Sequence, residues 1–129
     1  MYETLFPSLF QELVEKEYEL RVFYINRTFY SMAIFSQLDK QTSIDFRNYN
    51  RQKPNRTVPY QLPLHIEKKL LQLIDHFEFT TGSIDIIKSI SGEYIFLENN
   101  PVGQFGMTSS PCNYRLEKIV AKHLMNHGA

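Results

Sequence analysis

The pattern of apolar and polar residues changes its period along the chain, and each change predicts a different element. Apolar residues recur at helical spacing from Pro7 to Lys16, which predicts a short N-terminal helix. Two runs rich in aromatic and β-branched residues follow, Tyr18–Ile25 and Thr28–Ser36, and such runs are typical of strands. We expect them to form a hairpin around the intervening Asn-Arg pair, although Asn-Gly would be a stronger turn signal.

The periodic pattern is lost between Gln37 and Pro63, where prolines and asparagines are frequent. We therefore expect a long loop, and a loop of this length in a compact domain is either disordered or functional. An amphipathic helix is predicted next, from Leu64 to Phe77. Leucine and isoleucine recur along one of its faces, while charged residues occupy the other.

The stretch from Gly82 to Gly106, GSIDIIKSISGEYIFLENNPVGQFG, predicts two strands around a turn at Ser91-Gly92, followed by a glycine-rich loop. A last helix is expected from Asn113 to Met125. These elements predict a single domain over residues 1–129 of the α/β (α+β) class. We expect a mainly antiparallel sheet of about four main strands, with the two longer helices packed on one face.

Composition narrows the range of partners and compartments. The chain has 129 residues, enough for one domain with a hydrophobic core, and its formal net charge of zero indicates neither a nucleic-acid nor an anionic-membrane partner. No apolar run reaches the length of a membrane span, and the first residues do not form a signal peptide. The single cysteine, Cys112, excludes an internal disulfide and fits a cytoplasmic protein. Because its neighbours offer no activating base, we interpret it as a helix-start residue rather than a nucleophile.

Three oxygen-bearing side chains stand out in the second predicted strand pair. Asp85 lies inside the first strand, Glu98 closes the second, and Asn100 follows two residues later. Residues two apart on a strand share a face, and pairing around the turn brings Asp85 to the level of Glu98. Two carboxylates and an amide oxygen are hard ligands suited to Mg²⁺. The alternative is an acidic strand end with no ligand.

Charged residues also interrupt the other predicted segments. Arg47 and Arg56 lie in the long loop, where a guanidinium fork can bind phosphate or carboxylate, or can simply be solvated. We expect one of these two arginines to point toward the Asp85 and Glu98 carboxylates. Glu19 and Arg21 lie two apart on the first predicted strand, and the common interpretation of such residues is a solvated pair.

Several motifs resemble one known family. The string from Gly82 to Gly106 is similar to the C-terminal metal-binding signature of the ATP-grasp ligases, a G-x-D-hydrophobic strand followed by Glu-x-Asn-Pro. The strings LENNPVGQFGM, DFRNYN, PNRTVPYQLP and ELRVFYINRTFYSMAIFSQ resemble one branch in particular, the peptide-maturing enzymes of graspetide pathways. Within this branch the similarity is to the grasp-with-spasm maturases, relatives of the microviridin ligases. The resemblance extends from about Phe6 to about Leu124.

The resemblance implies a role for each candidate residue. Mg²⁺ or Mn²⁺ would be held by Asp85, Glu98 and Asn100, with ATP as a co-substrate. Nucleotide contacts are implied for Arg21, Arg47 and Asn100, with Arg21 facing the phosphates.

The remaining motif implied by the family is D-x-R, formed here by Asp45 and Arg47, which is associated with the peptide being modified. In the wider family an Arg-x-Asn at this point contacts ATP. Arg47 is followed by Asn48-Tyr49-Asn50, so the asparagine in that role stays open. Arg47 and Arg56 would stabilise charge on the transferring group.

The resemblance implies an ATP-dependent ligase that forms ester or amide crosslinks in a ribosomally made precursor peptide through an acyl phosphate. The alternative is a non-catalytic module, or truncated remnant, that holds a peptide or partner chain. We recognise only the C-terminal ATP-grasp portion, so we expect a homodimer or a second chain that supplies the missing half. The chain alone is then expected not to turn over ATP, and to expose Tyr24 or Tyr30 as an apolar patch.

Overall fold

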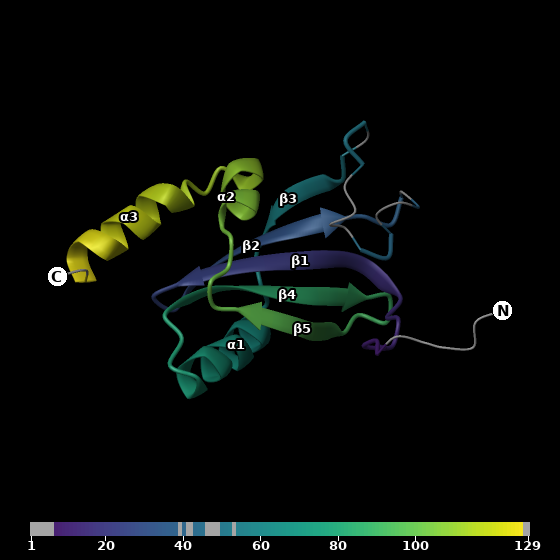
Figure 1. Ribbon diagram of the computed structural model, residues 1–129, viewed down its shortest axis with the longest axis horizontal. Coiled ribbons are helices and arrows are strands. Elements are labelled where there is room, and N and C mark those ends of the chain that lie inside the picture. Colours follow the sequence, from purple (N-terminus) through teal and green to yellow (C-terminus); the bar gives the residue numbers. More distant parts are fainter. Residues whose placement is uncertain (1–6, 39, 41–42, 46–49, 53, 128–129) are drawn as a thin grey trace.

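The computed structural model describes residues 7–38, 40, 43–45, 50–52 and 54–127 of the chain (Figure 1). Within these residues it contains five strands and three helices. In chain order they are β1 (Lys16–Ile25), β2 (Thr28–Phe35), β3 (Arg56–Tyr60), α1 (Leu64–His76), β4 (Thr81–Ser89), β5 (Tyr94–Asn100), α2 (Gly106–Cys112) and α3 (Leu116–His127).

The five strands form one sheet in the order β3-β2-β1-β4-β5, and every neighbouring pair is antiparallel. The central strand β1 pairs with β2 on one side and with β4 on the other, as Figure 1 shows. The turn between β1 and β2 places Asn26 and Arg27 at φ of 47° and 65°. Both values lie in the left-handed region that a two-residue hairpin turn requires, so the predicted hairpin is confirmed.

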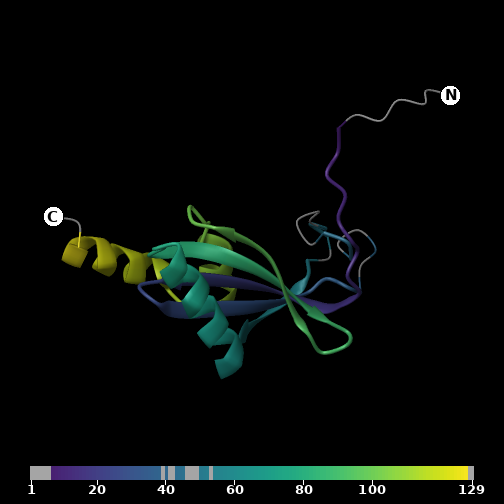
Figure 2. The same ribbon diagram turned by 90° about the horizontal axis from the view of Figure 1, so that it is seen from below.

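Helix α1 packs against one face of the sheet. Its buried residues Ile66, Leu70 and Ile74 form a single hydrophobic cluster with residues of β1, β2 and β4. The strand residues of this cluster are Leu20, Val22, Tyr24, Ala33, Ile84 and Ile86. Figure 2 views the sheet nearly edge-on and shows α1 on one side of it. The amphipathic pattern of residues 64–77 therefore predicted the helix and the centre of its buried face, whereas Leu64 and Phe77 at its two ends are exposed.

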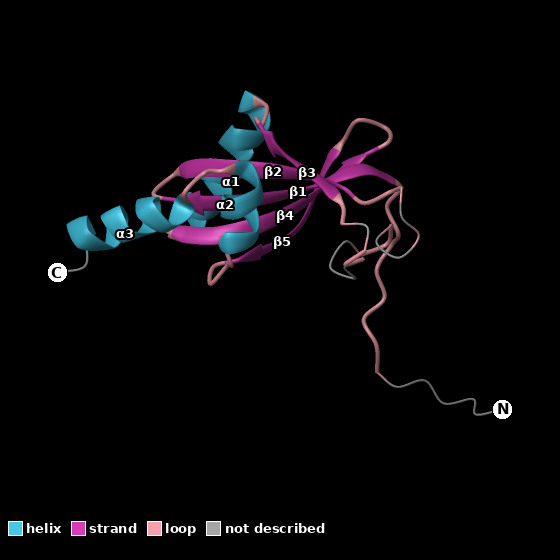
Figure 3. Cartoon of the chain, turned by 90° about the horizontal axis from the view of Figure 1, so that it is seen from above, coloured by secondary structure: helices cyan, strands magenta, loops and turns pink. Residues whose placement is uncertain are grey.

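The opposite face of the sheet is covered by α2 and α3 over part of its length. Phe23 and Ile25 of β1 pack with Leu116 of α3, while Met32 of β2 packs with Cys112 of α2. Figure 3 shows α2 lying across the strands. We expected helices on one face only, and the structure places them on both. The reason lies in β1, whose last four residues, 22–25, are all apolar and buried and therefore have to be covered on two sides.

The α/β class and the mainly antiparallel sheet are confirmed, and the elements that differ have local explanations. Strand β3 lies inside the stretch expected to be a loop. It is an edge strand, which is where Pro59 is tolerated. Helix α2 was not predicted because glycine, serine and proline are poor helix formers. Cys112 consequently lies at the end of a helix and not at its start.

Two further expectations are wrong. Residues 7–15 contain no helix, and the side chains of Leu9 and Phe10 are exposed because no element covers them. Tyr24 is fully buried under α1, and Tyr30 packs edge-on against Tyr114, so neither forms an exposed apolar patch. In the described part of the chain, the helices are too short and too polar to cross a lipid bilayer.

The packing of α1 gives a matched test. Leu70 is 5% exposed and Leu64 is 73% exposed on the same helix. We expect Leu70→Ala to lower the free energy of unfolding by about 2–5 kcal/mol, because it removes buried contacts and leaves a cavity. Leu64→Ala should change it by less than about 0.5 kcal/mol. Urea unfolding monitored by circular dichroism measures both, and equal effects would contradict the assigned buried face.

Candidate functional site

The site is built around two carboxylates on neighbouring strands. Asp85 of β4 is the cross-strand partner of Glu98 of β5. The next pair along is Ile86 with Phe96, so β5 contains one extra residue, Leu97, which makes a β-bulge. Directly opposed residues project from the same face of a sheet. The bulge therefore lets Glu98 share the face of Asp85, while Phe96 stays on the face of Ile86 and α1.

An arginine from the central strand binds Asp85. Arg21 of β1 is the cross-strand partner of Asp85, and its Nη1 donates to both carboxylate oxygens at 2.7 Å. The two side chains are only 11% and 10% exposed. Burial raises the pKa of the Asp85 carboxyl, the charge and hydrogen bonds of Arg21 oppose this, and Glu98 raises the pKa further. The acidic pair is thus only partly neutralised by the protein.

Asn100 lies on the same face as the two carboxylates. It pairs with Ser83, two residues before Asp85, and its Oδ1 accepts a hydrogen bond from the Val102 amide at 3.0 Å. The turn that follows lies against β4, since a Cβ at Gly103 would come within 2.4 Å of the Ser83 backbone nitrogen. The three predicted ligands therefore share one end of one sheet face. That all three bind one metal ion stays a prediction.

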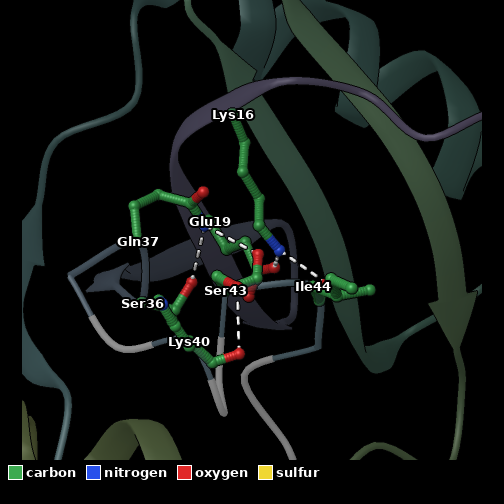
Figure 4. Close-up of polar contacts among 7 residues, drawn as sticks. All are labelled: Lys16, Glu19, Ser36, Gln37, Lys40, Ser43 and Ile44. Atoms are coloured by element: carbon green, nitrogen blue, oxygen red, sulfur yellow. Dashed lines mark hydrogen bonds and ion pairs between the residues drawn. The ribbon is translucent and has the colours of Figure 1, made fainter.

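A second charged cluster lies beside the first on the same face. Lys16 Nζ donates to Glu19 Oε1 and to the Ile44 carbonyl oxygen, the latter at 2.8 Å (Figure 4). Glu19 and Lys16 are both buried. Burial raises the pKa of the Glu19 carboxyl; Lys16 opposes this, whereas Asp45 and Asp85 raise the pKa further. From the sequence, Glu19 was expected to be half of a solvated pair or, by the family resemblance, part of a Glu-x-Arg near the nucleotide, whereas Lys16 was not expected to take part in the site.

A cavity of about 360 Å³ joins the two clusters. Carboxylates from three elements and from the loop line its polar part: Glu19, Asp45, Asp85 and Glu98. Apolar side chains line the rest: Leu13, Val14, Ile87 and Leu97. The apolar part was not predicted, although Ile87 lies two residues from Asp85 and Leu97 directly precedes Glu98 in the sequence.

The predicted arginines of the long loop have separate outcomes. Arg47 lies outside the described residues. Arg56 belongs to β3, pairs with Phe35, and lies 5.5 Å from the centroid of the Phe35 ring. Because Phe35 packs on the α1 side of the sheet, Arg56 lies on the face opposite Asp85 and is not the arginine that points to the carboxylates. The expectation that one of the two arginines does so rests on Arg47 and stays a prediction. The cation–π contact of Arg56 explains its position.

The donor set differs from that of a His- and Cys-rich metal site. Within the described ranges, no three His, Cys, Asp or Glu side chains are grouped as a metal site. Asp85 and Glu98 count as two such groups, and Asn100 would add an amide. Cys112 is buried with Met32 and Ile34, and burial raises the pKa of its thiol, which agrees with the interpretation that it is not a nucleophile.

The raised pKa of Glu19 predicts how stability depends on pH. Its ordinary value is 4.5, and a folded-state value above this means that its contribution is complete below pH 4.5 and is lost as pH rises through the folded pKa. Between about pH 4 and 7, wild type should therefore lose stability relative to Glu19→Gln. Urea unfolding at several pH values in EDTA tests this. Glu17→Gln, an exposed change on the same strand, controls for the loss of one charge. If wild type instead gained stability relative to Glu19→Gln over this pH range, Lys16 would lower the pKa of Glu19 by more than burial raises it.

Comparison with known proteins adds to this geometry. No family model and no curated protein matches the chain. Solved structures do match. A RiPP-associated ATP-grasp ligase of Chryseobacterium gregarium, in complex with ADP and a leader and core peptide, has a TM-score of 0.69 and 30% identity over 84% of this chain.

Two macrocyclases of Microcystis aeruginosa are also similar. MdnC, bound to the precursor peptide MdnA, has a TM-score of 0.57 and 40% identity over 71% of this chain. MdnB has a TM-score of 0.69 and 25% identity over 89% of it. The chain spans 35%, 27% and 40% of the lengths of the Chryseobacterium ligase, MdnC and MdnB, respectively. The resemblance inferred from the sequence is thus confirmed, and this chain is a structural relative of one part of the RiPP-associated ATP-grasp ligases.

Proposed function

We propose that this chain is part of an ATP-dependent ligase that forms ester or amide crosslinks in a ribosomally made precursor peptide. The observation that carries the proposal is the Asp85–Glu98 pair, which lies beside Arg21 in a cavity that has one acidic and one apolar part. The similar structures, one in complex with ADP and a leader and core peptide and another bound to a precursor peptide, support the same class of reaction.

The acidic part of the cavity fits a divalent cation. Carboxylate and amide oxygens are hard donors of the kind that Mg²⁺ or Mn²⁺ prefers. Each oxygen of Asp85 accepts one bond from Arg21, which leaves lone pairs available, and burial makes its charge costly without a nearby cation. We assign the ion to Asp85 and Glu98, with Asn100 as the third ligand. When bound, it would neutralise charge on the terminal phosphates of ATP.

The rest of the cavity suits the nucleotide. Ile87 and Leu97 offer an apolar wall directly beside the carboxylates, which is the combination that a purine base joined to a triphosphate requires. Arg21 Nε is buried and has no hydrogen-bond partner among the described residues, so the guanidinium keeps a donor beyond those that bind Asp85. We assign phosphate contacts to Arg21 and Arg47.

The loop supplies the peptide contacts in this proposal. Asp45, the first residue of the D-x-R motif, lines the cavity. We propose that Asp45 and Arg47 contact the precursor peptide and bring its reacting carboxylate to the terminal phosphate. A homodimer, or a partner chain, would supply the second wall of the nucleotide cleft.

The proposed reaction has two steps. An oxygen of the peptide carboxylate bonds to the γ-phosphorus as the bond to the β-phosphate oxygen breaks, which yields an acyl phosphate and ADP. A Ser or Thr hydroxyl or a Lys amine of the peptide then bonds to the acyl carbon. Inorganic phosphate leaves, the attacking group loses a proton, and the ring closes as an ester or amide. Arg21 and Arg47 stabilise charge on the transferring group.

One observation favours the alternative of a non-catalytic peptide-binding module. β5 is an edge strand, and its Phe96 side chain is 46% exposed on the face of α1. An edge strand of this kind accepts an extended peptide as an additional strand. Such a module would bind peptide without any requirement for a metal ion or ATP.

Titration with Mn²⁺, followed by electron paramagnetic resonance with and without ATP, separates the two functions. We expect Asp85→Asn and Glu98→Gln each to weaken Mn²⁺ binding at least about tenfold, because each removes a charged ligand. Glu17→Gln is the matched control, an exposed glutamate on β1. Equal affinities in all variants, or no Mn²⁺ binding by wild type, would contradict the ligase site. Peptide binding that persists in EDTA would then favour the module.

A further inference from the structure

A buried lysine at the start of the central strand has no role in the proposed chemistry. Lys16 is 7% exposed, and lysine is almost never buried to this degree unless it is paired. Its ammonium group donates to Glu19 on its own strand and to the Ile44 carbonyl oxygen in the loop after β2, as Figure 4 shows. One side chain therefore joins the sheet to a loop segment 28 residues further along the chain.

The Ile44 side chain does not bury itself against the sheet at the point where Lys16 binds the loop. Ile44 is 71% exposed, so its side chain does not anchor the loop by burial. Ser43 is bound from the end of β2, where Gln37 Nε2 donates to its carbonyl oxygen at 2.9 Å (Figure 4). Lys16 supplies the connection on the other side, to β1. The backbone of residues 43–44 is thus bound by two side chains, one from β1 and one that lies two residues after the end of β2.

Asp45, the residue after Ile44, faces the candidate site. It lines the same cavity as Asp85 and Glu98. Its charge also acts on the buried Glu19, whose carboxyl it makes harder to ionise. A shift of the Ile44 backbone would move Asp45 with it, because the two residues share a peptide bond.

Negative charges outnumber positive charges around the cavity, and this excess opposes the approach of the loop to the sheet. Five carboxylates line the cavity, those of Glu12, Glu19, Asp45, Asp85 and Glu98, and two cations, Lys16 and Arg21, lie beside them. Arg21 is bound to Asp85. Without Lys16, these carboxylates would have one fewer cation beside them, and like charges at short range repel. Lys16 offsets this repulsion at the point where the loop meets the sheet.

We propose that Lys16 is a positioning residue that holds Asp45 against the wall of the cavity, so that Asp45 meets the precursor peptide beside the bound nucleotide. That the ligand beside Asp45 is a precursor peptide rests on the proposed function. That Lys16 joins the loop to the sheet rests only on its contacts with Glu19 and Ile44. Lys16 acts through Ile44 and Asp45 and needs no contact with the reacting atoms.

The first test measures the order of the loop backbone. Lys16→Met alone would leave Glu19 as an unpaired buried charge, so the test variant is Lys16→Met/Glu19→Gln, and Glu19→Gln alone is its control. We expect the ¹⁵N order parameters of Ile44 and Asp45 to fall from near 0.85 to below about 0.6 in the double variant only. The order parameters of β1 and β4 should be unchanged. Ordered amides at 44 and 45 in the double variant would overturn the proposal.

The second test asks whether Lys16 acts through Asp45. We expect Asp45→Asn to change Mn²⁺ affinity severalfold in the Glu19→Gln background, and to have no effect once Lys16→Met is added. A merely structural loss would lower affinity without removing this coupling, and that result would count against the proposal. If wild type binds no Mn²⁺, the proposed function fails, but the order parameters still decide whether Lys16 is a tether.

Discussion

The ion pair between Arg21 and Asp85 determines how the rest of the molecule is arranged. It joins the two central strands, and both partners are almost completely buried on one face of the sheet. A buried carboxylate is tolerated only where its charge is balanced and its oxygens are bonded, so this part of the face cannot be packed under a hydrophobic helix. Helices α2 and α3 cover the other end of the same face, where β1 presents Phe23 and Ile25.

The sheet therefore has two different faces. The face under α1 is apolar along the central strands and provides most of the hydrophobic core. The other face is apolar only at the end covered by α2 and α3, and its remaining end carries the carboxylates and the cavity. Because the main hydrophobic cluster lies on the α1 side of the sheet, the charged end of the other face can bind a ligand without loss of this cluster. The fold thus separates the residues that stabilise it from those that form the site.

Elements that depend on neighbouring residues were predictable, and those that depend on distant contacts were not. The β1–β2 hairpin, α1 and the β4–β5 pair follow from local periodicity. Strand β3 forms because it pairs with the free edge of β2, and α2 is held by packing against Met32 and Ile34. Both contacts join residues far apart in the sequence, so local sequence patterns do not reveal them.

The same distinction applies to the site. Asp85 and Glu98 could be placed together because they flank one turn, whereas Arg21 lies 64 residues from Asp85 and meets it only through the β1–β4 register. Lys16 was missed for the same reason, since its loop partner becomes its neighbour only in the folded chain.

The bulge at Leu97 divides β5 into two parts whose sequences are constrained in different ways during evolution. Before the bulge, the side chains of Tyr94 and Phe96 lie on the sheet face that α1 covers. After it, Glu98 and Asn100 lie on the opposite face, at the candidate site. Substitutions in the first part are constrained by packing and those in the second by ligand chemistry. A lineage that lost its chemistry could therefore replace Glu98 and Asn100 freely and still keep this strand, its sheet and its core intact.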